Sequence, residues 1–192
     1  MRRVSLNDIN HLNTVIVVID AQKSIISATK DWELVLSKIE FLLDNAKVFH
    51  IPVFFTEQYP KGLGSTIEEL TAIMENKNVV IQKMEFNCFD NEDFVKHINS
   101  FSSLKYVVIL GVETHICVLQ TALGALEHNL TPVIISDATS SRKETDYKAA
   151  INLFNQFSIP ILTAEIFSYL VVKTAKSDKF KDLLKNVKKF SN

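Results

Sequence analysis

The 192-residue chain is poor in cysteine and has almost no net charge. Its two cysteines, Cys88 and Cys117, are too few for a disulfide framework, so we expect a reducing compartment. A formal net charge of −1 gives no general attraction to nucleic acid or to an anionic membrane. No stretch approaches the roughly 18 apolar residues of a membrane span, and residues 1–14 lack the apolar segment of a secretory signal. We therefore expect a cytoplasmic protein with neither a nucleic-acid nor a membrane partner.

Apolar segments of strand length alternate with segments of helical periodicity along the chain. An apolar fraction of 47% and a charged fraction of 22% suit one folded domain over residues 1–192. The alternation predicts an α/β fold, a three-layer sandwich with helices on both faces of a six-stranded, mainly parallel sheet. For this sheet we expect the Rossmann-like order 3-2-1-4-5-6. The predicted strands are residues 14–19, 51–56, 79–82, 106–110, 132–136 and 160–163, and the main predicted helices are residues 31–50, 66–75, 90–99, 144–157, 164–173 and 177–190.

The stretch from Val107 to Ala125 joins an apolar strand to a helix, with a cysteine near the junction. Gly111 interrupts the strand pattern, and we expect Thr114 to be the N-cap of the helix. Cys117 would then lie in the first helical turn, where partial positive charge and free backbone N–H groups favour a thiolate and can hold an oxyanion. The alternative, that Cys117 is only a small buried apolar residue, remains open from this stretch alone.

Three reactive side chains follow three predicted strands. Asp20 ends the first strand, Lys83 ends the third, and Cys117 comes just after the fourth. Parallel sheets bind ligands beyond the carboxyl ends of their strands, so these side chains would meet in one crevice. Lys83 would favour the thiolate, while Asp20 would accept and return a proton. Taken singly, Asp20 is typical of a turn cap and Lys83 of a surface ion pair, but their shared placement favours a nucleophilic site.

Three segments carry a resemblance to a known family. They are residues 20–22 (Asp-Ala-Gln), 83–89 (Lys-Met-Glu-Phe-Asn-Cys-Phe) and 111–117 (Gly-Val-Glu-Thr-His-Ile-Cys). In this order they resemble the signature segments of the isochorismatase-like cysteine hydrolases, which include nicotinamidase and N-carbamoylsarcosine amidohydrolase. Residues 56–64 and 137–142 further resemble the isochorismatase-domain-containing subgroup, some members of which are described as mitochondrion-associated ribonucleases.

The resemblance implies a catalytic triad of Asp20, Lys83 and Cys117. It also implies a non-proline cis peptide between Val112 and Glu113, and an oxyanion hole formed by the N–H groups of Glu113 and Cys117. Cys117 would attack an amide-like carbonyl and form a thioester, which water activated through Asp20 would then hydrolyse. The implied activity is hydrolysis of a small substrate at a C–N bond.

The second strand is where the chain departs from the metal-dependent members of that family. Metal-dependent nicotinamidases have an Asp-x-His pair there, whereas residues 56–59 read Thr-Glu-Gln-Tyr without a histidine. We therefore expect no metal and no cofactor. Gln22 and the three residues Glu57, Gln58 and Tyr59, which follow the predicted second strand, are our candidates for contacts with a small-molecule substrate. The alternative is a loop that binds no ligand.

Two other residues, His115 and Cys88, are expected to lie outside the catalytic set. His115 is expected at the edge of the pocket or at a subunit contact, not as a catalytic base, and Cys88 is expected in the core.

Because relatives self-associate, we expect a homo-oligomer, a dimer or tetramer. A catalytically silent interaction or scaffold protein is the main alternative function. RNA cleavage is a weaker one, because the charge is nearly neutral and no aromatic-basic motif is present.

Overall fold

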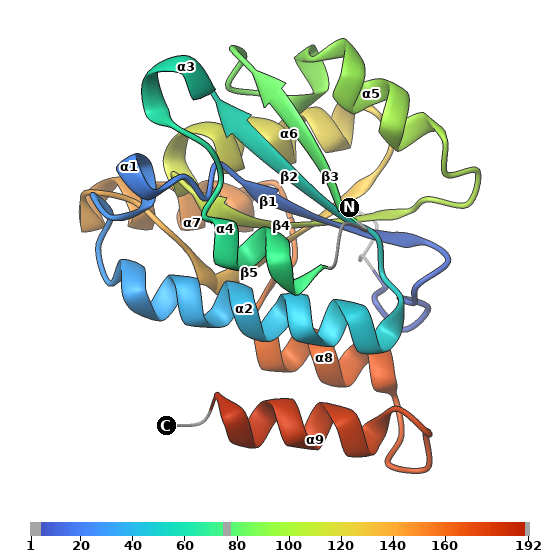
Figure 1. Ribbon diagram of the computed structural model, residues 1–192. Helices are drawn as coiled ribbons and strands as arrows, with labels where there is room; N and C mark the ends of the chain where they lie inside the picture. Colours follow the sequence, from blue (N-terminus) through green and yellow to red (C-terminus); the bar gives the residue numbers. More distant parts are fainter. Residues whose placement is uncertain (1–4, 75–77, 191–192) are drawn as a thin grey trace.

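The computed structural model describes residues 5–74 and 78–190 (Figure 1). Within this part of the chain, six strands form one sheet in the order β3-β2-β1-β4-β5-β6, and every pair of neighbours is parallel. The predicted sheet order is thus confirmed, and the sheet is parallel throughout. The strands are β1 (Thr14–Ile19), β2 (Val53–Gln58), β3 (Asn78–Lys83), β4 (Tyr106–Val112), β5 (Thr131–Ser140) and β6 (Ile161–Leu162).

Helices cover both faces of the sheet. In Figure 1, α2, α8 and α9 lie on one side, and α5, α6 and α7 lie on the other. The helices are α1 (Lys23–Ile26), α2 (Trp32–Phe49), α3 (Pro60–Leu63), α4 (Glu68–Ile73), α5 (Glu92–Asn99), α6 (Leu119–Glu127), α7 (Glu144–Gln156), α8 (Ala164–Val172) and α9 (Phe180–Lys189). None of these described helices is both long enough and apolar enough to span a membrane.

Two apolar cores lie on the two faces of the sheet. All six residues of β1 are buried, as expected for a β-branched strand covered on both sides. Ile16 and Val18 of β1 pack in the core beneath α2, whereas Val15 and Val17 pack in the opposite core with Phe94 of α5. This double coverage holds the strands in place, so that their carboxyl ends can present polar side chains along one edge.

Strands β2, β3, β4 and β5 all run further than the sequence predicts, with β3 ending at Lys83 and β4 at Val112. The prediction that Glu57 and Gln58 follow the second strand is wrong, because β3 keeps pairing with β2 as far as the Gln58–Lys83 pair. Strand β5 extends to Ser140, past the predicted end at Ser136. The predicted helix over residues 66–75 is the shorter α4, and its predicted last residue lies outside the described residues.

Gly111 is needed where β4 passes β1. Its φ is +102°, and a Cβ atom at this position would lie 2.0 Å from the carbonyl oxygen of Ile19. Glycine alone allows both this backbone conformation and this close approach. The carboxyl end of β4 is thereby held against the end of β1, which brings the segment before Cys117 next to Asp20.

Candidate active site

The carboxylate, ammonium and thiol predicted to meet do so at the carboxyl ends of β1, β3 and β4. Lys83 Nζ lies 2.7 Å from Asp20 Oδ2 and 3.6 Å from Cys117 Sγ. All three residues are buried, and Cys117 is the most exposed of them at 6%. The structure therefore places these groups within direct contact distance, although they are far apart in sequence.

Asp20 is oriented by the neighbouring strand as well as by Lys83. Its φ of 49° turns the chain at the end of β1. The backbone N–H of Asp20 donates to the carbonyl oxygen of Thr56, at 3.2 Å, and the Thr56 hydroxyl donates to Asp20 Oδ1, at 2.7 Å. Each carboxylate oxygen thus accepts from a different partner, which fixes the plane of the carboxylate. No local sequence signal assigns this role to Thr56, because only the β1–β2 pairing shows that it lies beside Asp20.

The Lys83 ammonium has more acceptors around it than it has protons. Besides Asp20 and Cys117, its Nζ lies 2.6 Å from Gln58 Oε1 and 3.3 Å from the carbonyl oxygen of Glu85. Burial acts to lower the pKa of Lys83, but the charge of Asp20, with smaller contributions from Cys88 and Cys117, raises that pKa above its ordinary value. Lys83 therefore stays protonated in its buried position.

Cys117 is a thiol at rest. Burial raises the pKa of Cys117 well above its ordinary value, and the neighbouring Asp20 charge raises it further, whereas Lys83 acts to lower it. This differs from the expectation that Lys83 and a helix end would hold a thiolate, because the negative charge of Asp20 offsets the charge of Lys83 and because the sulfur is removed from water. An attack by this sulfur would require loss of its proton, and Asp20 is the carboxylate beside it.

The turn that carries Cys117 is π-helical and not the first turn of an α-helix. It spans Thr114–Val118, and α6 begins only at Leu119. Thr114 is not the N-cap as predicted, because its hydroxyl is 2.9 Å from that of Thr139, which the extension of β5 places there. The peptide bond between Val112 and Glu113 is cis.

Glu113 is anchored by its side chain. Its carboxylate accepts from the backbone N–H of Arg142, at 2.9 Å, and from Arg142 Nε, at 3.1 Å. Glu113 is buried, so this paired carboxylate has little freedom to move. Arg142 lies in a segment that carries the family resemblance, but no local sequence signal pairs it with Glu113.

His115 faces the segment that follows β5. Its Nδ1 lies 2.9 Å from Ser141 Oγ, and its Nε2 lies 3.9 Å from Asp146 Oδ2. These contacts direct the imidazole towards the start of α7.

The four candidate substrate residues differ in what their side chains contact. Gln22 is fully buried and bonds to the backbone of Gln58 and of Gly64. Glu57 is buried and accepts from the backbone N–H of Thr66, at 2.7 Å. Tyr59, by contrast, is 47% exposed. It lies beside Lys83, because its backbone N–H donates to the carbonyl oxygen of that residue. Of these side chains, that of Tyr59 is the most open to an incoming molecule.

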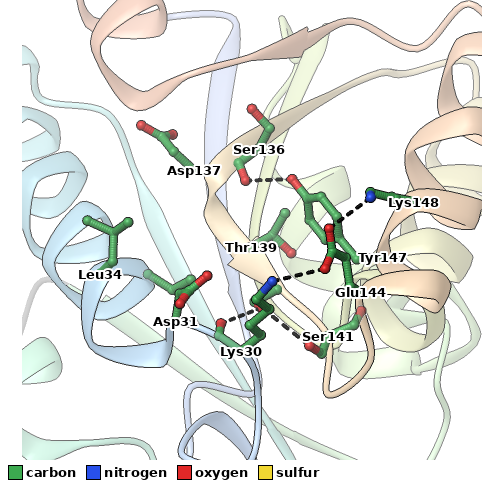
Figure 2. Close-up of a pocket in the computed structure, with 12 residues that line it drawn as sticks. Lys30, Asp31, Leu34, Ser136, Asp137, Thr139, Ser141, Glu144, Tyr147 and Lys148 are labelled. Atoms are coloured by element: carbon green, nitrogen blue, oxygen red, sulfur yellow. Dashed lines mark hydrogen bonds and ion pairs between the residues drawn. The ribbon is translucent and has the colours of Figure 1, made fainter.

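A separate cavity of about 270 Å³ lies at the carboxyl end of β5, between the starts of α2 and α7. Figure 2 shows Lys30 and Lys148 both pairing with Glu144 at its edge. No triad member lines it, although Ser141 connects its wall to His115. Within the described residues, no group of three or more histidine, cysteine or carboxylate side chains is arranged to hold a metal ion.

Comparisons with known proteins show which family has this arrangement of strands. A family model described as the isochorismatase domain matches residues 14–166. Isochorismatase domain-containing protein 1 of Danio rerio is 32% identical over 184 residues, which make up 96% of this chain and 64% of that protein. The chain therefore spans just under two thirds of the length of that relative.

Solved structures give the same picture. MAR1 ribonuclease from Caenorhabditis elegans matches with a TM-score of 0.87 and 30% identity, over 93% of this chain and 91% of its own. The YcaC gene product of Escherichia coli, described as an octameric hydrolase of unknown specificity, matches with a TM-score of 0.87 and 24% identity, over 96% of this chain and 93% of its own. At that identity, the likeness to YcaC concerns the fold alone.

Proposed function

Because this chain belongs to the isochorismatase family, we propose that it is a hydrolase in which Cys117 attacks a small substrate at an amide-like C–N bond. The observation that carries the proposal is the placement of Lys83 Nζ, 2.7 Å from Asp20 Oδ2 and 3.6 Å from Cys117 Sγ. A base, a cation and a nucleophile in contact can transfer a proton and stabilise the charge that follows.

In the first half-reaction, Asp20 accepts the proton of Cys117 while the sulfur attacks the carbonyl carbon. Lys83 offsets the negative charge that develops on the sulfur. The N–H groups of Glu113 and Cys117 are the proposed donors to the oxyanion, and the Glu113–Arg142 pair holds one of them steady. When the C–N bond breaks, the proton on Asp20 goes to the leaving nitrogen, and the acyl group remains on Cys117 as a thioester.

In the second half-reaction, water releases the acid. Asp20 accepts a proton from the attacking water, and the thioester breaks when that proton returns to Cys117 Sγ. The enzyme is then restored, with one water consumed for each C–N bond broken. Because Cys117 is only 6% exposed, the acyl part of the substrate has to be small enough to approach a nearly covered sulfur. Tyr59 is the proposed side chain over which it approaches, with Gln22, Glu57 and Gln58 behind it.

A panel of small amides and carbamoyl compounds tests the proposal. We expect hydrolysis of at least one compound by the wild type, and a loss of at least about 10³-fold in Cys117→Ala, since removal of a covalent nucleophile leaves only residual catalysis. Cys88→Ala is the matched control and should retain activity. If Cys117→Ala hydrolyses the same compounds as fast as the wild type, the proposal fails. If the wild type hydrolyses none of them, the catalytically silent interaction protein becomes the better account.

RNA cleavage is a second candidate because the C. elegans structure is named a ribonuclease. The formal net charge of −1 gives it no support from general electrostatics. Nuclease activity that is lost in Cys117→Ala would favour this candidate, whereas activity that persists in that variant would point to a contaminant. We also propose that the chain forms a homo-oligomer, and light scattering of the purified protein tests this directly.

A further inference from the structure

We infer that Gln58 is a positioning residue that fixes the ammonium of Lys83 beside Cys117, and that Gln22 holds Gln58 in place. The inference rests on the proposed function, because the position of this ammonium matters for catalysis only if Cys117 reacts. It assigns both glutamines a role in the catalytic machinery in place of the contact with substrate that the sequence suggests.

The geometry of Lys83 is the first step. An ammonium has three N–H donors. Asp20 Oδ2, at 2.7 Å, and Gln58 Oε1, at 2.6 Å, accept two of them at short distance. The third is left for Cys117 Sγ, at 3.6 Å, and the Glu85 carbonyl oxygen, at 3.3 Å. With two donors held, the direction of the third is set, so Gln58 determines how the positive charge faces the sulfur.

The amide of Gln58 can serve this role in one orientation only. Its Nε2 donates to the carbonyl oxygen of Met84, at 2.9 Å, while its Oε1 accepts from Lys83. Rotating the amide by half a turn would place an NH₂ group against the ammonium and an oxygen against a carbonyl oxygen. The two contacts therefore lock each other, and they tie Gln58 to the end of β3.

The side chain of Gln22 holds the backbone of Gln58 in place. Strand β1 ends at Ile19, so it offers no backbone partner to Gln58 at the end of β2. Instead, Gln22 Oε1 accepts from the N–H of Gln58, at 2.8 Å, and Gln22 Nε2 donates to the carbonyl oxygen of Gln58, at 3.0 Å. The buried side chain of Gln22 thus satisfies both backbone groups of Gln58, as a neighbouring strand would.

The neutrality of Gln58 matters as much as its position. Asp20 already places one negative charge beside the Lys83 ammonium. Gln58 adds a hydrogen-bond acceptor without adding a second negative charge. The ammonium therefore keeps enough positive charge to stabilise the sulfur when its proton leaves. A glutamate at position 58 would keep the acceptor and the size but would oppose charge on the sulfur.

Alkylation of Cys117 by iodoacetamide, followed by mass spectrometry from about pH 6 to about pH 9, tests this effect. We expect Gln58→Glu to slow alkylation at least about tenfold at each pH, because the thiolate fraction falls tenfold for each unit by which the thiol pKa rises. Gln156→Glu, an exposed residue at the end of α7, makes the same charge change far from Lys83 and should stay within about twofold of the wild type. Equal rates in the two variants would overturn the inference.

If Gln58→Glu loosened the fold, alkylation of both Cys117 and buried Cys88 would become faster, which is the opposite of the change that we expect.

A second experiment uses Gln58→Met, with an activated ester as substrate. Positioning predicts that the single-turnover rate of Cys117 acylation falls about tenfold, since Lys83 stabilises the sulfur in that step. An acylation rate equal to that of the wild type would overturn the inference. Failure of the proposed function is recognised separately, as hydrolysis that persists in Cys117→Ala.

Discussion

Lys83 Nζ and Asp20 Oδ2 are 2.7 Å apart, and the two side chains are 0% and 1% exposed. Both charged groups are removed from water. Their hydration is replaced by their mutual attraction, by the hydrogen bond from Thr56 to Asp20 and by the hydrogen bond from Lys83 to Gln58. Such a pair gives little net stability, but breaking it leaves an uncompensated charge in the interior. The pair therefore contributes little to folding, and under the proposed function its role is to act on Cys117.

The first prediction concerns this pair. Lys83→Met should lower the free energy of unfolding by about 3–5 kcal/mol, because Asp20 would remain buried without a cation. The double variant Asp20→Asn/Lys83→Met removes both charges and should lie within about 2 kcal/mol of the wild type. Urea denaturation measures both. Equal losses in the single and double variants would show that packing, and not charge, accounts for the cost.

The second prediction concerns Thr56, whose hydroxyl donates to Asp20 Oδ1 at 2.7 Å. Thr56→Val keeps the shape but removes a hydrogen bond to a charged group, so the free energy of unfolding should fall by about 1.5–3 kcal/mol. We also expect kcat to fall about tenfold, because the carboxylate loses one of the two bonds that orient it. Thr56→Ser retains the hydroxyl and should keep most of the activity. A serine variant as impaired as the valine variant would count against this role.

The third prediction concerns pH. Burial raises the pKa of the Cys88 thiol from its ordinary 9.0 to about 12. Between these values the unfolded chain releases the proton while the folded chain keeps it, so stability is full below pH 9 and is lost as the pH rises. The slope approaches about 1.4 kcal/mol per pH unit for one such group. Under reducing conditions, unfolding free energies of Cys88→Ala should fall less steeply from about pH 9 to about pH 10.5 than those of the wild type. Identical slopes would contradict the assignment.

The fourth prediction concerns Gly111, where a Cβ would lie 2.0 Å from the Ile19 carbonyl oxygen at a φ of +102°. Gly111→Ala should cost about 4 kcal/mol or more, because it combines a backbone clash with a disfavoured conformation. Gly64→Ala is the matched control, since Gly64 also has a positive φ, +81°, but no atom of the described residues beyond its chain neighbours lies within 4 Å of its Cβ position. Its cost should stay at about 1–3 kcal/mol, from conformation alone. Similar thermal shifts for the two would contradict the close β1–β4 approach.

Most of the fold could be predicted from the sequence, because its signals are local. The β-branched run of β1 and the helical periodicity of α2 specify their elements without reference to the rest of the chain. The sheet order follows from the alternation of strands and helices together with the family resemblance. The predicted positions of the strand ends were less accurate. The end of β2, for example, depends on the pairing of Gln58 with Lys83 in β3, and that contact is not local.

The reactive residues of the candidate site could be predicted from the sequence, but the residues that contact and orient them could not. Asp20, Lys83 and Cys117 could be selected because each follows an apolar strand, and parallel strands end at one edge. The roles of Gln22 and Thr56 could not, because they depend on which backbone atoms face each side chain across β1 and β2. The resting state of Cys117 was also missed, since a pKa depends on burial and on the opposing charges of Asp20 and Lys83.

The most direct measurement of the central claim is mass spectrometry of the protein during hydrolysis of an activated acetyl ester, whose leaving group needs no proton. The account predicts that wild-type protein turns the ester over with an acetyl group on Cys117, that Asp20→Asn turns it over at least about 10²-fold more slowly because both half-reactions lose their base, and that Cys117→Ala neither turns it over nor carries the acetyl group. Hydrolysis at the wild-type rate by Cys117→Ala, or an Asp20→Asn variant that turns over as fast as the wild type with no acetyl group on Cys117, would contradict it.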